Sequence, residues 1–141
     1  MASEKILLVD DHKESLEWLG DHLKSLGWDV IAANGGREAL EKVRRTKPNL
    51  ILLDMEMPEI NGFEVARSLR EDPDYRDIPI LAVTALSRRY DRERCLAAGC
   101  NDFLSKPFTP QALQRHLANF LPVSGSPAWT DGTDGSNPRD S

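Results

Sequence analysis

Five short apolar runs alternate with longer amphipathic stretches along most of this chain, and the alternation limits the folds open to it. The runs consist of aliphatic and aromatic residues, as is typical of buried strands. They are Ile6–Val9, Val30–Ala32, Leu50–Leu53, Ile80–Val83 and Phe103–Leu104. Apolar residues in the following stretches recur at helical spacing. Because parallel strands need long crossovers, five strands alternating with five helices predict an α/β fold with a doubly wound parallel sheet.

Turn and cap residues support this division of the chain. Gly27 and Gly99 stand where two of the predicted helices should end. Thr109 and Pro110 have the pattern of a helix N-cap followed by proline at the first helical position. The first and third strands are apolar almost to their last residues, which indicates central strands buried on both faces.

Residues 122–141 have a different composition from the rest of the chain. Ten of these twenty residues are Pro, Gly or Ser, and Trp129 is their only large apolar side chain. Such a segment buries too little surface to offset the entropy of ordering it. We therefore expect one globular domain over residues 1–121, followed by a disordered tail over residues 122–141.

The overall composition argues against several classes of function. With 18 basic and 23 acidic residues the chain has a formal charge of −5, which gives no overall attraction to nucleic acid. No apolar run approaches the roughly 20 residues of a membrane helix. The first residues lack the pattern of a signal peptide, so we expect a cytoplasmic location without membrane association.

The cysteines and histidines do not suggest a metal site of their own. Cys95 and Cys100 are five positions apart, which fits neither a CxxC redox motif nor a zinc knuckle, so two reduced thiols are expected. His12, His22 and His116 are scattered singly along the chain, and we expect solvated surface residues rather than metal ligands.

Polar residues stand at the carboxyl ends of the predicted strands, where open parallel sheets bind their ligands. Asp10 and Asp11 follow the first strand, Asp54 the third and Thr84 the fourth, and Lys106 comes soon after the fifth. Carboxylates brought together in this way repel one another unless a cation is present. Mg²⁺ prefers such oxygen ligands, and a carboxylate can act as a nucleophile that forms an acyl phosphate. The pattern therefore predicts magnesium-dependent phosphoryl transfer to an aspartate.

In order and spacing, these residues resemble the signature of the receiver domains of two-component response regulators. The matching positions are Asp10-Asp11, Asp54-Met55-Glu56-Met57-Pro58, Gly62, Thr84-Ala85, Phe103 and Lys106-Pro107. The resemblance covers about residues 5–121. It implies a flavodoxin-like sheet with strand order 2-1-3-4-5 and five helices, in a single-domain protein similar to the chemotaxis regulators.

The resemblance also implies roles for the residues of the site. Asp54 would accept a phosphoryl group from a histidine kinase or phosphotransfer protein. Asp11, Asp54 and the backbone carbonyl of Glu56 would bind Mg²⁺, with Asp10 acting through water. Lys106 would pair with Asp54 or with its phosphate.

A switch pair is implied next to this site. The Thr84 hydroxyl would move to the phosphate while the Phe103 ring turns inward, which would change a surface made by the fourth helix, the fifth strand and the fifth helix. By this resemblance the protein is a signalling switch in a phosphorelay. It would catalyse only its own phosphorylation and dephosphorylation, and would act through an unknown downstream protein.

Other proteins with this strand pattern fit the sequence less well. A flavodoxin-like redox protein should have a phosphate loop rich in Ser, Thr and Gly after its first strand, whereas this loop begins Asp-Asp-His-Lys-Glu. A phosphatase of the haloacid dehalogenase type would need two aspartates separated by one residue, which Asp10 and His12 do not supply. A pseudo-receiver that acts only as a binding module would lack one or more of the five polar residues at the strand ends, and none of them is missing here.

A DNA-binding response regulator is the closest alternative. Only 20 residues follow Leu121, which is too few for a helix-turn-helix domain, so output through another protein or through a domain outside this sequence is expected. The predicted fourth helix carries a basic cluster, in which Arg88, Arg89, Arg92 and Arg94 alternate with Asp91 and Glu93. The alternation favours a solvated helix face over a docking patch.

Overall fold

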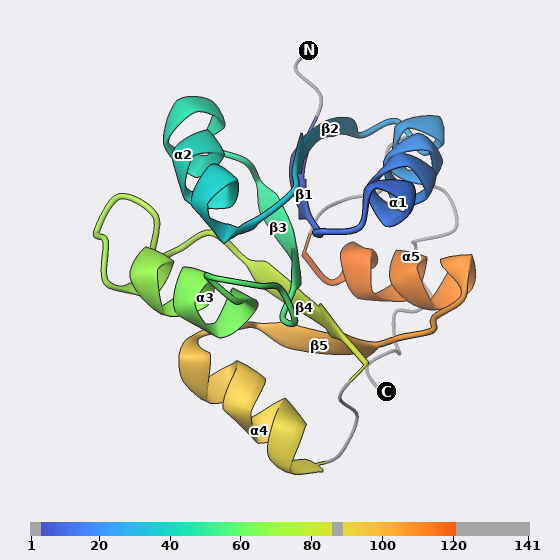
Figure 1. The fold of residues 1–141 in the computed structure, drawn as a ribbon. Coiled ribbons are helices and arrows are strands. Elements are labelled where there is room, and N and C mark those ends of the chain that lie inside the picture. The colour runs from blue at the N-terminus through green and yellow to red at the C-terminus, as the bar shows by residue number, and fades with distance from the viewer. Residues whose placement is uncertain (1–3, 86–88, 121–141) are drawn as a thin grey trace.

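The computed structural model describes residues 4–85 and 89–120. Five strands alternate with five helices along these residues (Figure 1). The strands are β1 Lys5–Val9, β2 Asp29–Ala33, β3 Leu50–Asp54, β4 Ile80–Thr84 and β5 Asp102–Ser105. The helices are α1 Lys13–Ser25, α2 Gly36–Thr46, α3 Gly62–Arg70, α4 Arg89–Ala98 and α5 Pro110–Ala118. The predicted alternation is confirmed.

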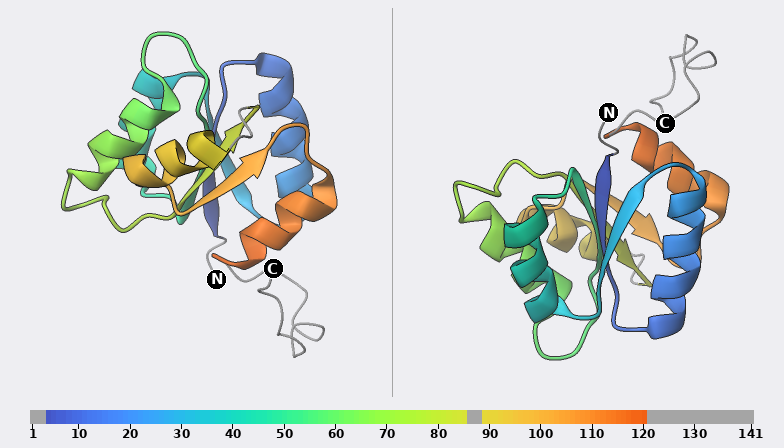
Figure 2. Two further views of the ribbon diagram at one scale, coloured as in Figure 1. Left: turned by 90° about the horizontal axis from the view of Figure 1, so that it is seen from below. Right: turned by 90° about the horizontal axis from the view of Figure 1, so that it is seen from above.

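All five strands are parallel and lie in the order β2-β1-β3-β4-β5, as predicted. Helices α2, α3 and α4 cover one face of the sheet, and α1 and α5 cover the other (Figures 1 and 2). The direction of winding reverses between β1 and β3. In sheets of this kind, ligands bind outside the carboxyl ends of the strands at such a reversal.

The central strand β3 anchors two apolar cores, one on each face of the sheet. Its successive side chains point to opposite faces, so Ile51 and Leu53 pack beneath α2, α3 and α4, while Leu50 and Leu52 pack beneath α1 and α5. Each of these four side chains is almost fully buried, which stabilises the fold by roughly 1.5–3 kcal/mol per side chain. Asp54, the last residue of β3, is therefore held by a rigid strand.

Helix ends fall where the glycine and cap residues predict them. Gly27 and Gly99 have φ values of 101° and 113°, which L side chains rarely adopt. The Thr109 side chain accepts a hydrogen bond from the backbone N–H of Ala112 at 3.0 Å, as expected of an N-cap before proline.

Arg70, the last residue of α3, joins three segments at the amino edge of the sheet. Its guanidinium donates four hydrogen bonds of 2.8 Å each. The acceptors are the backbone oxygens of Arg76, Ile78 and Gly99 and the side-chain oxygen of Asn101. Asn101 in turn accepts from the backbone N–H of Ile80 at 2.8 Å, so this network fixes the starts of β4 and β5.

Cys95 and Cys100 are free thiols, as predicted, and both are buried. Burial raises the pKa of Cys100 to about 12, so its thiol stays protonated at neutral pH. The expectation that the three histidines are solvated is right for His12, whereas His22 and His116 are half-buried.

The prediction of a fully solvated face on α4 is wrong at one position. Asp91 is only 2% exposed, whereas Arg92 and Glu93 are exposed as predicted. The Arg94 guanidinium lies 4.3 Å from the centre of the Phe63 ring, which links α4 to α3 through a cation–π contact.

The predicted tail over 122–141 and Arg88 lie outside the described residues. Of the helices in residues 4–85 and 89–120, none is long and apolar enough to cross a membrane.

Candidate functional site

The structure brings the predicted polar residues together at the carboxyl edge of the sheet. Asp54 and Thr84 are the last residues of the adjacent strands β3 and β4, and Asp10 comes directly after β1. Asp10 and Asp54 are each 2% exposed and Thr84 is fully buried. Buried carboxylates at one edge of a sheet need compensation, since burial alone disfavours their charge.

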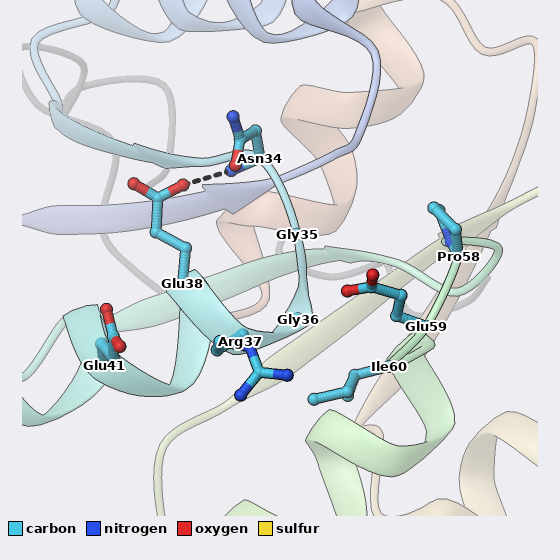
Figure 3. A pocket seen from close by; sticks show the side chains of 9 residues that line it. All are labelled: Asn34, Gly35, Gly36, Arg37, Glu38, Glu41, Pro58, Glu59 and Ile60. Atoms are coloured by element: carbon cyan, nitrogen blue, oxygen red, sulfur yellow. Dashed lines mark hydrogen bonds between the residues drawn. The ribbon is translucent and has the colours of Figure 1, made fainter.

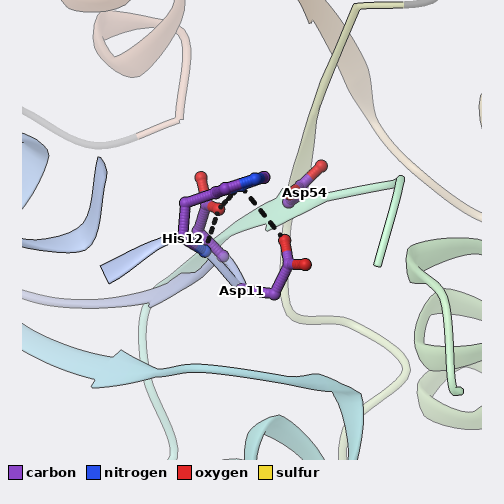
Figure 4. Close-up of side chains that lie close together, drawn as sticks. Asp11, His12 and Asp54 are labelled. Carbon is purple, nitrogen blue, oxygen red and sulfur yellow. Dashed lines mark hydrogen bonds and ion pairs between the residues drawn. The ribbon is translucent and has the colours of Figure 1, made fainter. Parts of the chain in front are cut away.

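Four side chains at this edge could share one ion. Single ligand atoms of Asp10, Asp11, His12 and Asp54 all lie within 4.8 Å of one another. Figure 4 shows the side chains of Asp11 and His12, from the segment after β1, close to Asp54 at the end of β3. Three of the four donors are carboxylates, the ligands that hard divalent cations prefer.

The two oxygens of Asp54 have different surroundings. Oδ1 accepts a hydrogen bond from the backbone N–H of Glu56 at 3.0 Å. Oδ2 is buried and has no hydrogen-bond partner among the described residues. The pKa of Asp54 is raised to about 6, chiefly because the carboxyl is buried; the Glu56 N–H and Lys106 act to lower it, and the charges of Asp10 and Asp11 act to raise it. The carboxylate is thus destabilised in its charged form and has one oxygen free for a ligand.

Lys106 faces two of the carboxylates at once. Its Nζ lies 3.7 Å from Oδ2 of Asp54 and 3.7 Å from Oδ2 of Asp10. These distances allow Coulomb attraction but exceed hydrogen-bond length. The backbone N–H of Lys106 donates to the Thr84 carbonyl oxygen at 2.8 Å, which ties the segment after β5 to the end of β4.

The residues present fit a magnesium ion. Asp11 Oδ1 and Asp54 Oδ2 are buried oxygens without a hydrogen-bond partner among the described residues, so a cation could satisfy both. Mg²⁺ takes oxygen ligands and is usually bound through one or two carboxylates. That the Glu56 carbonyl also binds the ion, and that Asp10 acts through water, stay predictions.

Thr84 and Phe103 lie on neighbouring strands near this edge. β4 and β5 pair so that Ala82 is opposite Phe103 and Thr84 is opposite Ser105. Phe103 is half-buried and packs against the core beneath α2, α3 and α4. That these two residues form a switch pair, and that they move on phosphorylation, stay predictions.

Sequence reasoning missed two contacts at this edge. The Glu56 side chain accepts a hydrogen bond from the backbone N–H of Ala85 at 3.0 Å, which joins the loop after β3 to the residue after Thr84. His12 donates its backbone N–H to Asp10 Oδ1 at 2.9 Å, and its ring lies against both Asp10 and Asp11. The side chain of an aspartate commonly accepts a hydrogen bond from the backbone N–H two residues later, which was the available signal.

A surface pocket of about 520 Å³ lies between the start of α2 and the loop before α3 (Figure 3). Its lining comprises Asn34, Gly35, Gly36, Arg37, Glu38, Glu41, Pro58, Glu59 and Ile60. Glu38 is already engaged, because it accepts from the backbone N–H of Asn34 at 2.8 Å and pairs with Lys42 at 3.0 Å. None of the predicted site residues lines this pocket, so the acidic edge is the better candidate for the functional site.

Comparisons with known proteins identify the family. Residues 6–118 match the family model of the response regulator receiver domain. The polar-differentiation response regulator DivK of Brucella ovis is 35% identical over 119 residues, which cover 84% of this chain and 97% of DivK. The probable transcriptional regulator ycf27 of Porphyridium aerugineum is 40% identical over 121 residues, or 86% of this chain. These residues span only 49% of ycf27, so the match covers about half of that protein's length.

Solved structures agree with these sequence matches. The chemotaxis protein CheY4 of Vibrio cholerae superposes with a TM-score of 0.81 at 32% identity, over 85% of this chain and 100% of CheY4. The receiver domain of the sensor histidine kinase PA1611 from Pseudomonas aeruginosa, solved with a magnesium ion coordinated in its active-site cleft, gives a TM-score of 0.78. It is 37% identical over 84% of this chain and 98% of that domain. This chain belongs to the response regulator receiver domain family, whose members act as switches in two-component signalling.

Proposed function

We propose that Asp54 is the phosphoacceptor of this receiver domain and takes its phosphoryl group from a histidine kinase or a phosphotransfer protein. One observation carries the proposal. Oδ2 of Asp54 is a buried carboxylate oxygen at the end of the central strand, without a hydrogen-bond partner among the described residues. It faces Lys106 at 3.7 Å, so both a nucleophilic atom and a countercharge are in place.

Mg²⁺ is the metal in this proposal. Asp11, Asp54 and the Glu56 carbonyl would hold it, with Asp10 acting through water, and the ion coordinated in the PA1611 receiver domain supports this choice. When bound, the ion would neutralise negative charge on the incoming phosphoryl group. It would also satisfy the two buried oxygens of Asp11 and Asp54.

The neighbouring residues divide the remaining tasks. Lys106 would pair with the phosphoryl group, which its ammonium can reach by a small movement from 3.7 Å. The Thr84 hydroxyl would donate to a phosphoryl oxygen. Since phosphorylation places a group with a charge of about −1.5 to −2 at one point, it would bias the position of Thr84 and of the half-buried Phe103 rather than remodel the core.

The movement of Thr84 and Phe103 would determine how the domain passes on its signal. The surface formed by α4, β5 and α5 would carry the signal to a downstream protein, and the domain would catalyse only its own phosphorylation and dephosphorylation. We assign the domain to residues 1–121 and expect residues 122–141 to be dispensable for the switch. A cytoplasmic location, without membrane or nucleic-acid partners, stays a prediction.

Intact-mass spectrometry tests the proposal directly. The untagged full chain, incubated with Mg²⁺ and acetyl phosphate, should gain one phosphoryl group. Asp54→Asn should gain none, whereas Asp21→Asn, which changes an exposed aspartate of α1, should be labelled like the wild type. Labelling of Asp54→Asn to the wild-type level would refute the assignment.

A further inference from the structure

The acidic cluster at the carboxyl edge contains a nitrogen donor, His12. Nδ1 of the ring lies 3.2 Å from Asp10 Oδ1 and 3.3 Å from Asp11 Oδ1. The side chain is 67% exposed, so packing does not force it onto the carboxylates. The hydrogen bond from the backbone N–H of His12 to Asp10 Oδ1, at 2.9 Å, sets the turn that places the ring there.

These separations match the edges of a metal coordination sphere. An ion that binds its donors at about 2.1 Å in an octahedron holds neighbouring donors about 3.0 Å apart. The two distances from Nδ1 are close to this value, and a ligand atom of Asp54 lies within 4.8 Å of the other three. One nitrogen and three carboxylates thus lie close enough together to share a single ion.

A second observation shows that the cluster is open to a ligand. Asp54 is only 2% exposed, and its Oδ2 has no hydrogen-bond partner among the described residues. Nζ of Lys106 lies 3.7 Å from this oxygen, which is too far for a hydrogen bond. An ion at the cluster would satisfy this oxygen.

His12 offers a nitrogen donor, so the metal ions whose binding it strengthens are those that prefer nitrogen ligands. Mg²⁺ prefers oxygen ligands, so an imidazole adds little to its binding. Ni²⁺, Cu²⁺ and Zn²⁺ are well suited to imidazole ligands, and the affinities of Ni²⁺ and Cu²⁺ for nitrogen and oxygen sites exceed those of Mn²⁺, Fe²⁺ and Co²⁺. A neutral ring with its proton on Nε2 presents the lone pair of Nδ1 to such an ion.

We infer that His12, together with Asp10, Asp11 and Asp54, forms a mixed nitrogen–oxygen site that binds a divalent transition-metal ion in competition with Mg²⁺. The inference rests on the metal-binding role of Asp11 and Asp54 in the proposed function, and adds a ligand that changes the selectivity of the site. A bound transition ion would exclude Mg²⁺ from the phosphorylation site.

The other two histidines are engaged elsewhere. The His22 ring stacks on Trp18 with their centroids 6.3 Å apart, and Nδ1 of His116 pairs with Asp102 at 2.6 Å. In the part of the chain that the structure describes, the cluster around His12 is the only group of three or more possible ligands that meets in this way. His22 therefore provides a matched control on the neighbouring helix.

Calorimetric titration of the untagged full chain tests the inference, with NiCl₂ and MgCl₂ as separate probes. His12→Ala should weaken Ni²⁺ binding about tenfold or more and change Mg²⁺ affinity less than about twofold. His22→Ala should change neither. With Cu²⁺, electron paramagnetic resonance should show nitrogen coupling in the wild type and in His22→Ala, and should lose it in His12→Ala. Unchanged Ni²⁺ affinity in His12→Ala, or an equal loss for Ni²⁺ and Mg²⁺, would overturn the inference.

The outcome is separable from that of the proposed function. If Ni²⁺ binding depends on His12 while acetyl phosphate labels Asp54→Asn as well as the wild type, the metal site stands and the phosphoacceptor assignment fails. If labelling depends on Asp54 while His12→Ala binds Ni²⁺ normally, the phosphoacceptor assignment stands and the metal site with His12 fails.

Discussion

The two edges of the sheet differ in how their charged side chains are hydrogen-bonded. At the amino edge, the Arg70 guanidinium donates four hydrogen bonds of 2.8 Å to acceptors from two segments, the one before β4 and the one before β5. At the carboxyl edge, Asp10 and Asp54 are each 2% exposed, and Oδ2 of Asp54 has no hydrogen-bond partner among the described residues. The guanidinium of Arg70 is thus hydrogen-bonded on each of its nitrogens, whereas one oxygen of Asp54 lacks such a partner in the described part of the chain.

The difference separates a structural charge from a functional one. Hydrogen bonds to a charged group stabilise a fold when every partner is supplied by the fold. An unsatisfied buried carboxylate destabilises the fold, and it is retained where a ligand supplies the missing partner. Removing the charge should therefore have opposite effects on stability at the two edges.

The largest effect is expected for Arg70. Replacing it with Met keeps an apolar stem but removes all four hydrogen bonds, so the free energy of unfolding should fall by about 2–4 kcal/mol. Arg67→Met, at an exposed position of the same helix, should change it by less than about 0.5 kcal/mol. Urea unfolding of the two variants measures the difference, and equal stabilities would show that the Arg70 network is not structural.

Asp54→Asn should shift stability in the other direction. The pKa of Asp54 is raised to about 6 in the folded protein, above its ordinary value of 3.8, so the folded state holds its proton more tightly. The free energy of unfolding should therefore fall as the pH rises from about 4 to about 6. In the Asp54→Asn variant the free energy of unfolding should not fall in this way. At pH 7 without Mg²⁺ the variant should therefore be more stable than the wild type by about 1–3 kcal/mol.

Urea titrations of both proteins at pH 4, 5, 6 and 7 would check this prediction. The two curves should converge at the acidic end and separate towards neutral pH. A variant that is less stable than the wild type at pH 7 would show that the fold, rather than a ligand, satisfies Asp54.

Mg²⁺ should stabilise the folded protein, because it would supply the partner that the buried Asp54 oxygen at the carboxyl edge lacks among the described residues. A ligand that binds only the folded state at ten times its Kd stabilises it by about 1.4 kcal/mol. The Tm of the wild type should rise accordingly, whereas Asp11→Ala and Asp54→Asn should respond much less. Thermal unfolding with MgCl₂, and with NaCl at the same ionic strength as the control, measures the effect. An equal rise in all three proteins would place the ion elsewhere.

Sequence reasoning succeeded where local pattern and topology fix the position of a residue. Asp54 could be placed at the edge because a run of apolar residues ends there, and Thr109 could be assigned as an N-cap from the proline that follows it. The contacts of Arg70 could not be predicted, because its acceptors come from segments far apart in the sequence. Asp91 lies among basic residues in the sequence yet is buried, since only the packing of α4 decides which face it occupies.

The site shows the same division. The strand pattern predicts that Asp10, Asp54 and Lys106 meet, because parallel strands end at one edge. It does not predict that the His12 ring contacts the acidic pair, since that contact depends on a turn of two residues.

The smallest effect is expected for a paired but partly exposed charge. Asp102, the first residue of β5, pairs with His116 at 2.6 Å, and each side chain is more than a quarter exposed. Burial raises the pKa of Asp102, but the hydrogen bonds from His116 and from the Phe103 N–H outweigh it and lower the pKa overall. The stabilisation is therefore present above the ordinary pKa near 4 and lost as the pH falls through the folded-state pKa.

His116→Ala should thus lower the free energy of unfolding by less than about 1 kcal/mol at pH 6. Arg115→Ala, at an exposed position of the same helix, is the matched control. A loss as large as that expected for Arg70→Met would mean that pairing, rather than burial of the partners, determines how much a charge stabilises this sheet.

Chemical trapping of the phosphorylated residue tests the central claim most directly. Sodium borohydride reduces an aspartyl phosphate to homoserine, so the wild-type chain is treated with acetyl phosphate and Mg²⁺, reduced, digested and sequenced by tandem mass spectrometry. Homoserine should appear at position 54 and should disappear when Mg²⁺ is chelated. Homoserine at Asp10 or Asp11 instead, or equal labelling without Mg²⁺, would contradict the account.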